Sequence, residues 1–246
     1  PVIFANGVFA NTLSWFNQTP FFSEKGYQVI LYDMRGQGNS EKPKKDYSFD
    51  IHAEDQKALL EKLGISKINH VGISYGSELG LIFALKYPET VNTLTVCSAV
   101  TYIGPYLNQV SQLWKAACVK ADPMMFYYAT VPFNFSETYI KENSKVLEQA
   151  KERYKLFDYP AFVRLMDSFL ELNIPNEDLK KIQVPTCVIG GEKDLLKPPV
   201  PYSRVIYGNL PNSELHIIPD SGHVVTWEKP NEFNSIVLGF LEKHRD

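Results

Sequence analysis

A G-x-S-x-G motif is formed by the run Gly72-Ile73-Ser74-Tyr75-Gly76. It lies where an apolar run, Ile68–Ser74, gives way to a segment with helical spacing near 76–87. A very tight strand-to-helix turn needs small residues on both sides of the serine, so the motif predicts an exposed serine nucleophile. Glu78, one turn into that helix, is expected to interact favourably with the positive amino terminus of the helix, and a supporting role near the nucleophile is the alternative.

A serine alcohol becomes a useful nucleophile only when a base takes its proton, and histidine is the commonest base. Of five histidines, His223 is the best candidate because it follows a predicted strand, Glu214–Pro219, in a loop before the last helix. The other histidines are expected to have structural or solvent roles. We expect His52 and His244 to be solvated in polar helices, and His70 and His216 to pack or hydrogen-bond within strands.

The imidazole needs a carboxylate that holds one tautomer and stabilises its positive charge. Asp194 comes just after a predicted strand, Thr186–Gly190, and therefore at the same edge of the sheet. Glu192 and Asp220 are rivals, although Glu192 is closer to the strand end and Asp220 is better placed to cap the histidine turn. The favoured order along the chain is serine, aspartate, histidine.

These side chains need a sheet whose strands end together. Buried strands between helical layers are apolar on both faces, and strand–helix alternation favours a mostly parallel sheet. We predict strands at Val2–Ala5, Gln28–Asp33, Ile68–Ser74, Val91–Val100, Thr186–Gly190 and Glu214–Pro219, and helices near 12–25, 50–63, 76–87, 199–207 and 230–244. The predicted fold class is α/β, with a twisted sheet flanked by helices.

The alternation is interrupted between Tyr102 and Ile174, where aromatic residues are dense and no strand is expected. Pro175 and Pro185 bracket the return to strand–helix alternation. We therefore predict an α/β core in two parts, 1–103 and 176–246, with a helical cap inserted at 104–175. The aromatic residues of the insertion include Tyr106, Trp114, Phe126, Tyr127, Tyr128, Phe133, Phe135 and Tyr139.

The chain resembles the α/β-hydrolase superfamily over essentially its whole length. Besides the serine motif, the run Tyr32–Ser40 is similar to the loop after the second strand in these proteins, and Pro219–His223 with Glu228 and Pro230 is similar to their histidine loop. Within the superfamily, the chain most resembles the small carboxylesterase and enol-lactonase group, which has a helical cap.

The loop at 35–40 is expected to shape the scaffold and one wall of the pocket. A nucleotide-binding role does not fit, because Glu41 stands where the third glycine of a G-x-G-x-x-G motif would be.

The resemblance also implies an oxyanion hole, made of two backbone N–H groups. One belongs to Tyr75, directly after the serine, and the other to Val8 in the run Asn6-Gly7-Val8-Phe9. These proteins usually have a histidine where this chain has Asn6. Because the donor is a backbone group, the substitution is expected to alter the bracing of the loop rather than to remove the hole.

Composition excludes several other classes of protein. The chain has 246 residues, is 44% hydrophobic and carries a net charge of −3, which argues against disorder and a nucleic-acid partner. Its longest apolar stretch, roughly residues 71–85, is broken by Glu78 and is too short to span a bilayer. Its three cysteines, Cys97, Cys118 and Cys187, are far apart and are predicted to be buried thiols in a reducing, cytoplasmic compartment. Since the sequence opens at Pro1, we expect a preceding segment to have been removed or left out.

The predicted activity is that of a serine hydrolase, with Ser74, Asp194 and His223 as the catalytic triad. Its expected substrate is a small, fairly apolar carboxylic ester or lactone, cleaved through an acyl-enzyme intermediate without a cofactor or a bound metal. The partner is a small acyl molecule, and no particular oligomeric state is predicted. Three alternatives remain: a thioesterase or acyltransferase, a cofactor-free C–C hydrolase or peroxidase-type enzyme, and a non-catalytic binding protein.

Overall fold

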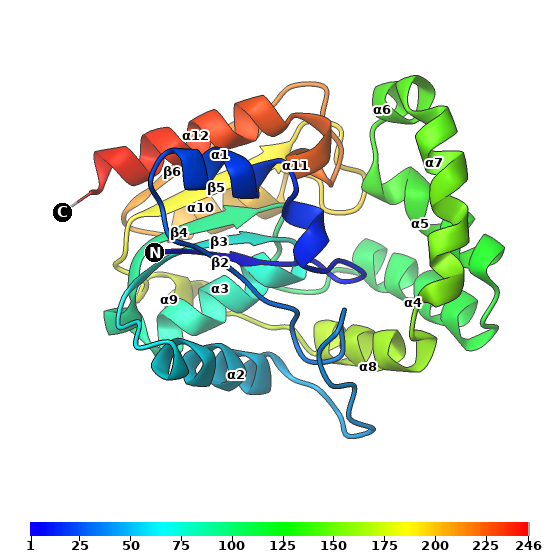
Figure 1. Cartoon of the computed structure of the whole chain (residues 1–246), viewed down its shortest axis with the longest axis horizontal. Coiled ribbons are helices and arrows are strands. Elements are labelled where there is room, and N and C mark those ends of the chain that lie inside the picture. The colour runs from blue at the N-terminus through cyan, green and yellow to red at the C-terminus, as the bar shows by residue number, and fades with distance from the viewer. Residues whose placement is uncertain (246) are drawn as a thin grey trace.

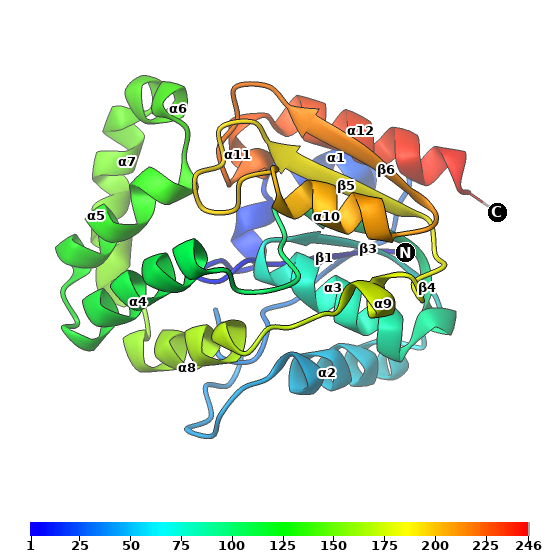
Figure 2. The ribbon, with the colours of Figure 1, turned by 180° about the vertical axis from the view of Figure 1, so that it is seen from behind.

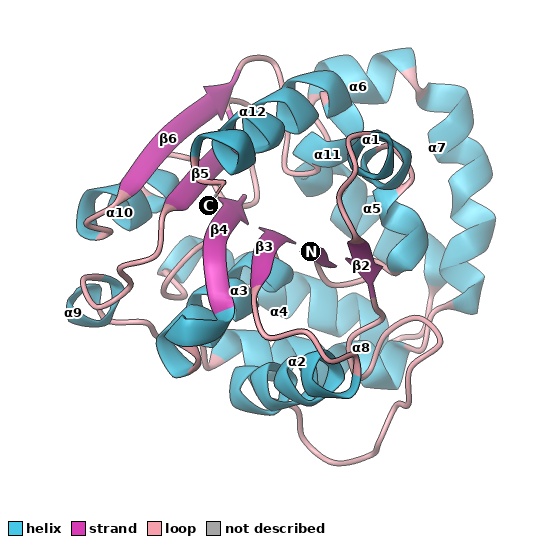
Figure 3. Ribbon diagram, turned by 60° about the vertical axis from the view of Figure 1, so that its left-hand side comes forward, coloured by secondary structure: helices cyan, strands magenta, loops and turns pink. Residues whose placement is uncertain are grey.

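A six-stranded parallel sheet forms the centre of the computed structural model, which describes residues 1–245. The strands lie in the order β2-β1-β3-β4-β5-β6, and all neighbouring pairs are parallel (Figure 3). Their bounds are Val2–Ala5 (β1), Val29–Leu31 (β2), Ile68–Ile73 (β3), Val91–Cys97 (β4), Thr186–Gly191 (β5) and Ser213–Ile218 (β6). The six predicted strands and the α/β class are therefore confirmed.

Helices cover both faces of the sheet (Figures 1 and 3). One face packs against α1 (Gln18–Glu24) and α12 (Pro230–Lys243), and the other against α2 (Phe49–Lys62), α3 (Tyr75–Lys86) and α10 (Tyr202–Asn209). This double cover explains why β1 and β5 are buried along their whole length. Short helical turns complete the core: η1 (Thr12–Trp15), η2 (Pro88–Thr90), α9 (Asn176–Leu179) and α11 (Val225–Glu228).

Most of the segment between β4 and β5, from α4 to α8, is helical and lies beyond the end toward which the strands point (Figures 1 and 2). It contains α4 (Pro105–Val119), α5 (Pro123–Asn134), α6 (Glu137–Glu142), α7 (Ser144–Ala150), η3 (Lys151–Leu156) and α8 (Tyr159–Leu170). An isolated antiparallel bridge between Tyr102 and Asn173 joins the two ends of this segment. The helices are therefore anchored at the carboxyl edge of the sheet.

A second anchor joins these helices to the loop that follows β6. The carboxylate of Glu228 accepts hydrogen bonds from the backbone N–H and the hydroxyl of Ser136, at 3.1 and 2.6 Å. The backbone N–H of Val224 also donates to the carbonyl of Asn134 at 3.1 Å. The junction between α5 and α6 is thus held against the loop that carries His223.

The three cysteines are buried free thiols, as predicted. Across residues 1–245, the structure contains no helix with the length and apolar character needed to traverse a bilayer.

Candidate active site

Ser74 lies at a strained turn between β3 and α3. Its φ is 54° and its ψ is −125°, a conformation that L residues rarely adopt outside functional turns. The two glycines of the motif make this turn possible, because a Cβ at Gly72 would lie 2.4 Å from the carbonyl oxygen of Gly76. A Cβ at Gly76 would lie only 2.1 Å from that of Ala5. The hydroxyl therefore stands at the carboxyl end of a central strand.

Asp194 and His223 form a buried pair at the same edge. Asp194 follows β5, and its Oδ2 lies 2.8 Å from Nδ1 of His223, with both side chains almost fully excluded from solvent. The other oxygen, Oδ1, accepts hydrogen bonds from the backbone N–H groups of Leu196 and Lys197 at 2.9 and 2.8 Å. These bonds fix the carboxylate, which in turn can hold the imidazole with its proton on Nδ1.

Hydrogen bonds to the end of β4 hold Ser74 and His223 near the same place. The N–H of Ser74 donates to the carbonyl of Cys97, and the hydroxyl of the next residue, Ser98, donates to the carbonyl of His223 at 3.0 Å. Within residues 1–245, no direct hydrogen bond joins Ser74 Oγ to the imidazole. Catalytic hydrogen bonds are often long without substrate, so this spacing is compatible with proton transfer in the loaded site.

Beside the serine lies a lysine that the sequence analysis did not identify. Lys197 Nζ lies 3.2 Å from Ser74 Oγ and 2.7 Å from Oε1 of Glu78, and both charged side chains are buried. Glu78 also accepts a hydrogen bond from the backbone N–H of Val100 at 2.9 Å. Burial raises the pKa of Glu78, while Lys197 and this N–H favour the ionised carboxylate.

Glu78 therefore does more than interact with a helix terminus, the role expected from the sequence. One feature of the sequence could have indicated that Lys197 lies at the site. It is a charged residue between Leu195-Leu196 and Pro198-Pro199, only three positions after Asp194.

The two rival carboxylates lie elsewhere in the loops. Glu192 accepts a hydrogen bond from the backbone N–H of Asp220 at 3.1 Å. Asp220 does not cap the histidine turn as expected, because its Oδ1 accepts a hydrogen bond from Thr138 in α6 at 2.9 Å. Of these three candidate acids, only Asp194 contacts the ring of His223 in the described chain.

The loop after β1 passes directly over the serine. A Cβ at Gly7 would lie 3.2 Å from Cβ of Ser74, and Val8 lines the same cavity as Ser74 and Tyr75. Asn6 braces this loop by accepting a hydrogen bond from the indole of Trp15. The backbone N–H groups expected to form an oxyanion hole thus belong to two segments that meet at the serine.

The cavity at Ser74 is small, with a volume of about 20 Å³, which is room for about one water molecule. Two helices of the segment between β4 and β5 supply most of its apolar wall, because Trp114 comes from α4 and Phe169 from α8. The lining residues are Val8, Ser74, Tyr75, Leu107, Ser111, Trp114, Met166, Phe169, Leu196 and Lys197.

Two of the other histidines, His52 and His244, depart from the expectation that they are solvated. His52 is buried rather than solvated, and its Nδ1 lies 3.0 Å from the hydroxyl of Tyr75, which also contacts Ser168. Burial lowers the pKa of His52 to about 4 and that of His70 to about 3, which favours neutral rings. His244 is half-buried and packs on Phe240.

The loop at 35–40 does not supply a wall of the cavity at Ser74, contrary to the expectation. It borders a separate cleft of about 300 Å³ beside α2, where Arg35 forms two hydrogen bonds with Asp55, at 2.7 and 2.6 Å. The loop's shape depends on Asp33, whose carboxylate accepts hydrogen bonds from the backbone N–H groups of Thr12 and Asn39. Its role is therefore to support the scaffold.

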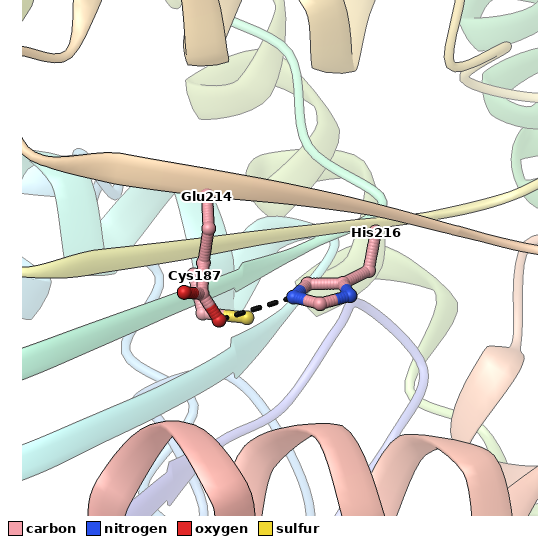
Figure 4. A group of neighbouring side chains, drawn as sticks. All are labelled: Cys187, Glu214 and His216. Carbon is pink, nitrogen blue, oxygen red and sulfur yellow. Dashed lines mark hydrogen bonds and ion pairs between the residues drawn. The ribbon is translucent and has the colours of Figure 1, made fainter. Parts of the chain in front are cut away.

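One group of potential metal ligands, which sequence spacing did not indicate, lies away from this site. Cys187, Glu214 and His216 project from β5 and β6 with ligand atoms within 4.8 Å of one another (Figure 4). Glu214 is already paired with Lys243 at 2.8 Å and with His216 at 3.1 Å, and burial raises the pKa of the Cys187 thiol. Because Cys187 is the second residue of β5, the cluster lies toward the opposite end of the strand from Asp194.

Comparisons with known proteins agree with the α/β fold of the chain. Residues 1–230 match the profile of a family described as alpha/beta hydrolase fold. A protein named as a carbamate hydrolase, RutD, from Caulobacter sp. (strain K31) is 29% identical over 98% of this chain and 90% of its own length. The 3-oxoadipate enol-lactonase 2 of Acinetobacter baylyi is 26% identical over 98% of this chain and 88% of its own.

A crystal structure extends the likeness to three dimensions. It is that of an alpha/beta hydrolase enzyme from a Medee basin deep-sea metagenome library, and it superposes with a TM-score of 0.93. The two sequences are 32% identical, and the match covers 98% of this chain and 88% of that one.

Proposed function

Because the chain belongs to the alpha/beta hydrolase fold family, we propose that it is a serine hydrolase that cleaves a small, fairly apolar carboxylic ester or lactone. The observation that carries this proposal is the convergence of two features at one sheet edge. One is Ser74 at its positive-φ turn, and the other is the buried pair of Asp194 and His223 at 2.8 Å. Relatives named as a carbamate hydrolase and an enol-lactonase support hydrolysis as the class of reaction.

Acylation begins when Nε2 of His223 takes the proton of the Ser74 hydroxyl and Oγ attacks the acyl carbonyl carbon. The electron pair of the carbonyl bond moves to its oxygen, which accepts hydrogen bonds from the N–H groups of Val8 and Tyr75. Asp194 stabilises the imidazolium without taking its proton. The imidazolium then protonates the leaving alcohol as the tetrahedral intermediate collapses to the acyl-enzyme.

Deacylation reverses these roles with water in place of the alcohol. His223 takes a proton from the water, whose oxygen attacks the acyl carbon, and the acid leaves as the proton returns to Ser74 Oγ. No cofactor is needed for either half-reaction.

The helical segment 104–175 acts in this proposal as a cap that limits the size of the acyl group. Its apolar walls, represented by Trp114 and Phe169, favour an uncharged acyl chain, and the cavity of about 20 Å³ favours a short one. Because a cavity of this size holds only about one water molecule, any acyl group requires side chains of the cap to move, and an acetyl group requires the smallest movement.

Hydrolysis of p-nitrophenyl esters with acyl chains from C2 to C12 tests the proposal. We expect the highest kcat/KM at C2 and a steady fall with chain length. Replacing Ser74 by alanine should lower kcat by about 10⁴-fold or more.

Ser23→Ala is the matched control, since Ser23 is exposed on α1 far along the chain from the motif. Equal activity of Ser74→Ala and the control, or no labelling of the wild-type protein by a fluorophosphonate, would refute the proposal.

A further inference from the structure

The ammonium group of Lys197 is fully surrounded by partners inside the protein. Its Nζ lies 2.7 Å from Oε1 of Glu78, 3.2 Å from Oγ of Ser74 and 4.7 Å from the ring centre of Phe169. An ammonium has three N–H bonds, so a carboxylate, a hydroxyl and an aromatic face can accept all of them. The side chain is only 2% exposed, and solvent therefore screens this charge poorly.

Both members of the ion pair are held by backbone groups that fix their positions. The backbone N–H of Lys197 donates to Oδ1 of Asp194, the same carboxylate that contacts His223. Glu78 accepts the N–H of Val100, just after β4. The lysine is thus placed by the catalytic acid on one side and by the nucleophile helix on the other.

Stability alone is a weak explanation for such a pair. Desolvation of two buried charges often costs more than their attraction returns, and apolar replacements of similar size are often neutral or stabilising. A charge pair whose cation also contacts the nucleophile oxygen therefore points to a role in the chemistry.

We propose that Lys197 is a further catalytic residue, which donates a charged hydrogen bond to Ser74 Oγ, and that Glu78 is its positioning residue. This inference rests on the proposed serine hydrolase function. Because a carboxylate oxygen lies 2.7 Å from its Nζ, we assign Lys197 the role of a cationic hydrogen-bond donor and not that of the base.

The hydroxyl group of Ser74 has the proton and the lone pairs that this role requires. It has one proton to give to His223 and two lone pairs, of which one accepts from Lys197 and the other attacks the carbonyl carbon. The lysine keeps its proton throughout and stabilises negative charge as it develops on Oγ. In deacylation the bond between the acyl carbon and Oγ breaks, its electron pair returns to Oγ, and His223 supplies the proton.

The test replaces the pair together, as Lys197→Met/Glu78→Gln, so that no buried charge is left without a partner and the backbone N–H of Val100 keeps an acceptor. We expect a melting temperature within a few degrees of the wild type. The rate of fluorophosphonate labelling and the kcat for p-nitrophenyl acetate should both fall about 10²-fold, with little change in KM. A merely structural role would lower the melting temperature together with the labelling rate, whereas the assigned role lowers the labelling rate alone.

A second double variant, Lys197→Gln/Glu78→Gln, keeps hydrogen-bonding groups of similar length but removes both charges. Because charged hydrogen bonds are about twice as strong as neutral ones, we expect kcat to fall about tenfold. This second variant tests the role of Lys197 if the first double variant does not fold.

Two results overturn the inference and can be told apart. Wild-type rates in either folded double variant would remove the catalytic role of Lys197 while leaving the serine hydrolase proposal intact. Absence of both ester hydrolysis and labelling in the wild-type protein itself would instead remove the proposed function.

Discussion

Replacing Asp194 by asparagine isolates the role of one carboxylate without changing its size. The carboxylate has three partners: Nδ1 of His223 at 2.8 Å, and the backbone N–H groups of Leu196 and Lys197 at 2.9 and 2.8 Å. All three are donors when the imidazole carries its proton on Nδ1. An asparagine amide has only one acceptor oxygen, so it cannot satisfy all three.

The two backbone donors decide how the amide is oriented. Turning the oxygen toward His223 would leave the N–H groups of Leu196 and Lys197 unsatisfied, at about 1–3 kcal/mol each. The oxygen therefore stays with the backbone, and the NH₂ group of the amide faces Nδ1 of His223. The imidazole proton then moves to Nε2, where it blocks acceptance of the proton from Ser74.

We expect Asp194→Asn to lower kcat about 10⁴-fold, equivalent to about 5.5 kcal/mol of lost transition-state stabilisation. The assay is hydrolysis of p-nitrophenyl acetate at neutral pH, with a thermal melt to show that the variant folds. Glu192→Gln is the matched control, because the half-exposed side chain of Glu192 contacts the backbone N–H of Asp220 and, at 3.6 Å, the ammonium of Lys193. If Asp194→Asn keeps more than a tenth of the wild-type kcat, or the control loses as much, the reasoning is wrong.

Two further predictions concern stability. Gly76→Ala would place a Cβ 2.1 Å from the carbonyl oxygen of Ala5 and should cost about 3 kcal/mol or more of unfolding free energy. Gly239→Ala in α12, where a Cβ meets no described atom within 4 Å, should instead gain up to about 1 kcal/mol, and equal urea midpoints would contradict this contrast. Burial lowers the pKa of His52 to about 4, so between its unfolded value near 6.5 and pH 4 the unfolded chain binds more protons. His52 alone should therefore lower the free energy of unfolding by about 1.4 kcal/mol for each pH unit of acidification over this range. His52→Gln, which can still accept a hydrogen bond from Tyr75, should reduce the pH dependence of the unfolding free energy, measured with urea, by that amount. An unchanged slope would show that His52 is not the group responsible.

The strands and the serine turn could be predicted because their signals are local. A strand buried on both faces must be apolar along its own length, whichever strand it pairs with, and this gave the six strands within three residues of their observed ends. The turn at Ser74 needs Gly72 and Gly76 within two residues of the serine. Asp194 and His223 could be nominated because the carboxyl ends of parallel strands share one edge.

The contacts that the sequence did not indicate all join distant segments. Lys197 and Ser74 are 123 positions apart, and Lys197 and Glu78 are 119 apart, so their meeting depends on how the loop after β5 folds over α3. The burial of His52 likewise depends on α2 packing its face against the side chain of Tyr75.

By itself, the sequence therefore determined the elements, the edge at which they end and the residue types available there. Tertiary structure alone decided which of those residues touch, how large the cavity is and which charges are buried. The physical reason is that periodicity and turn chemistry act over a few residues, whereas the register between strands and the docking of helices bring together groups more than a hundred residues apart.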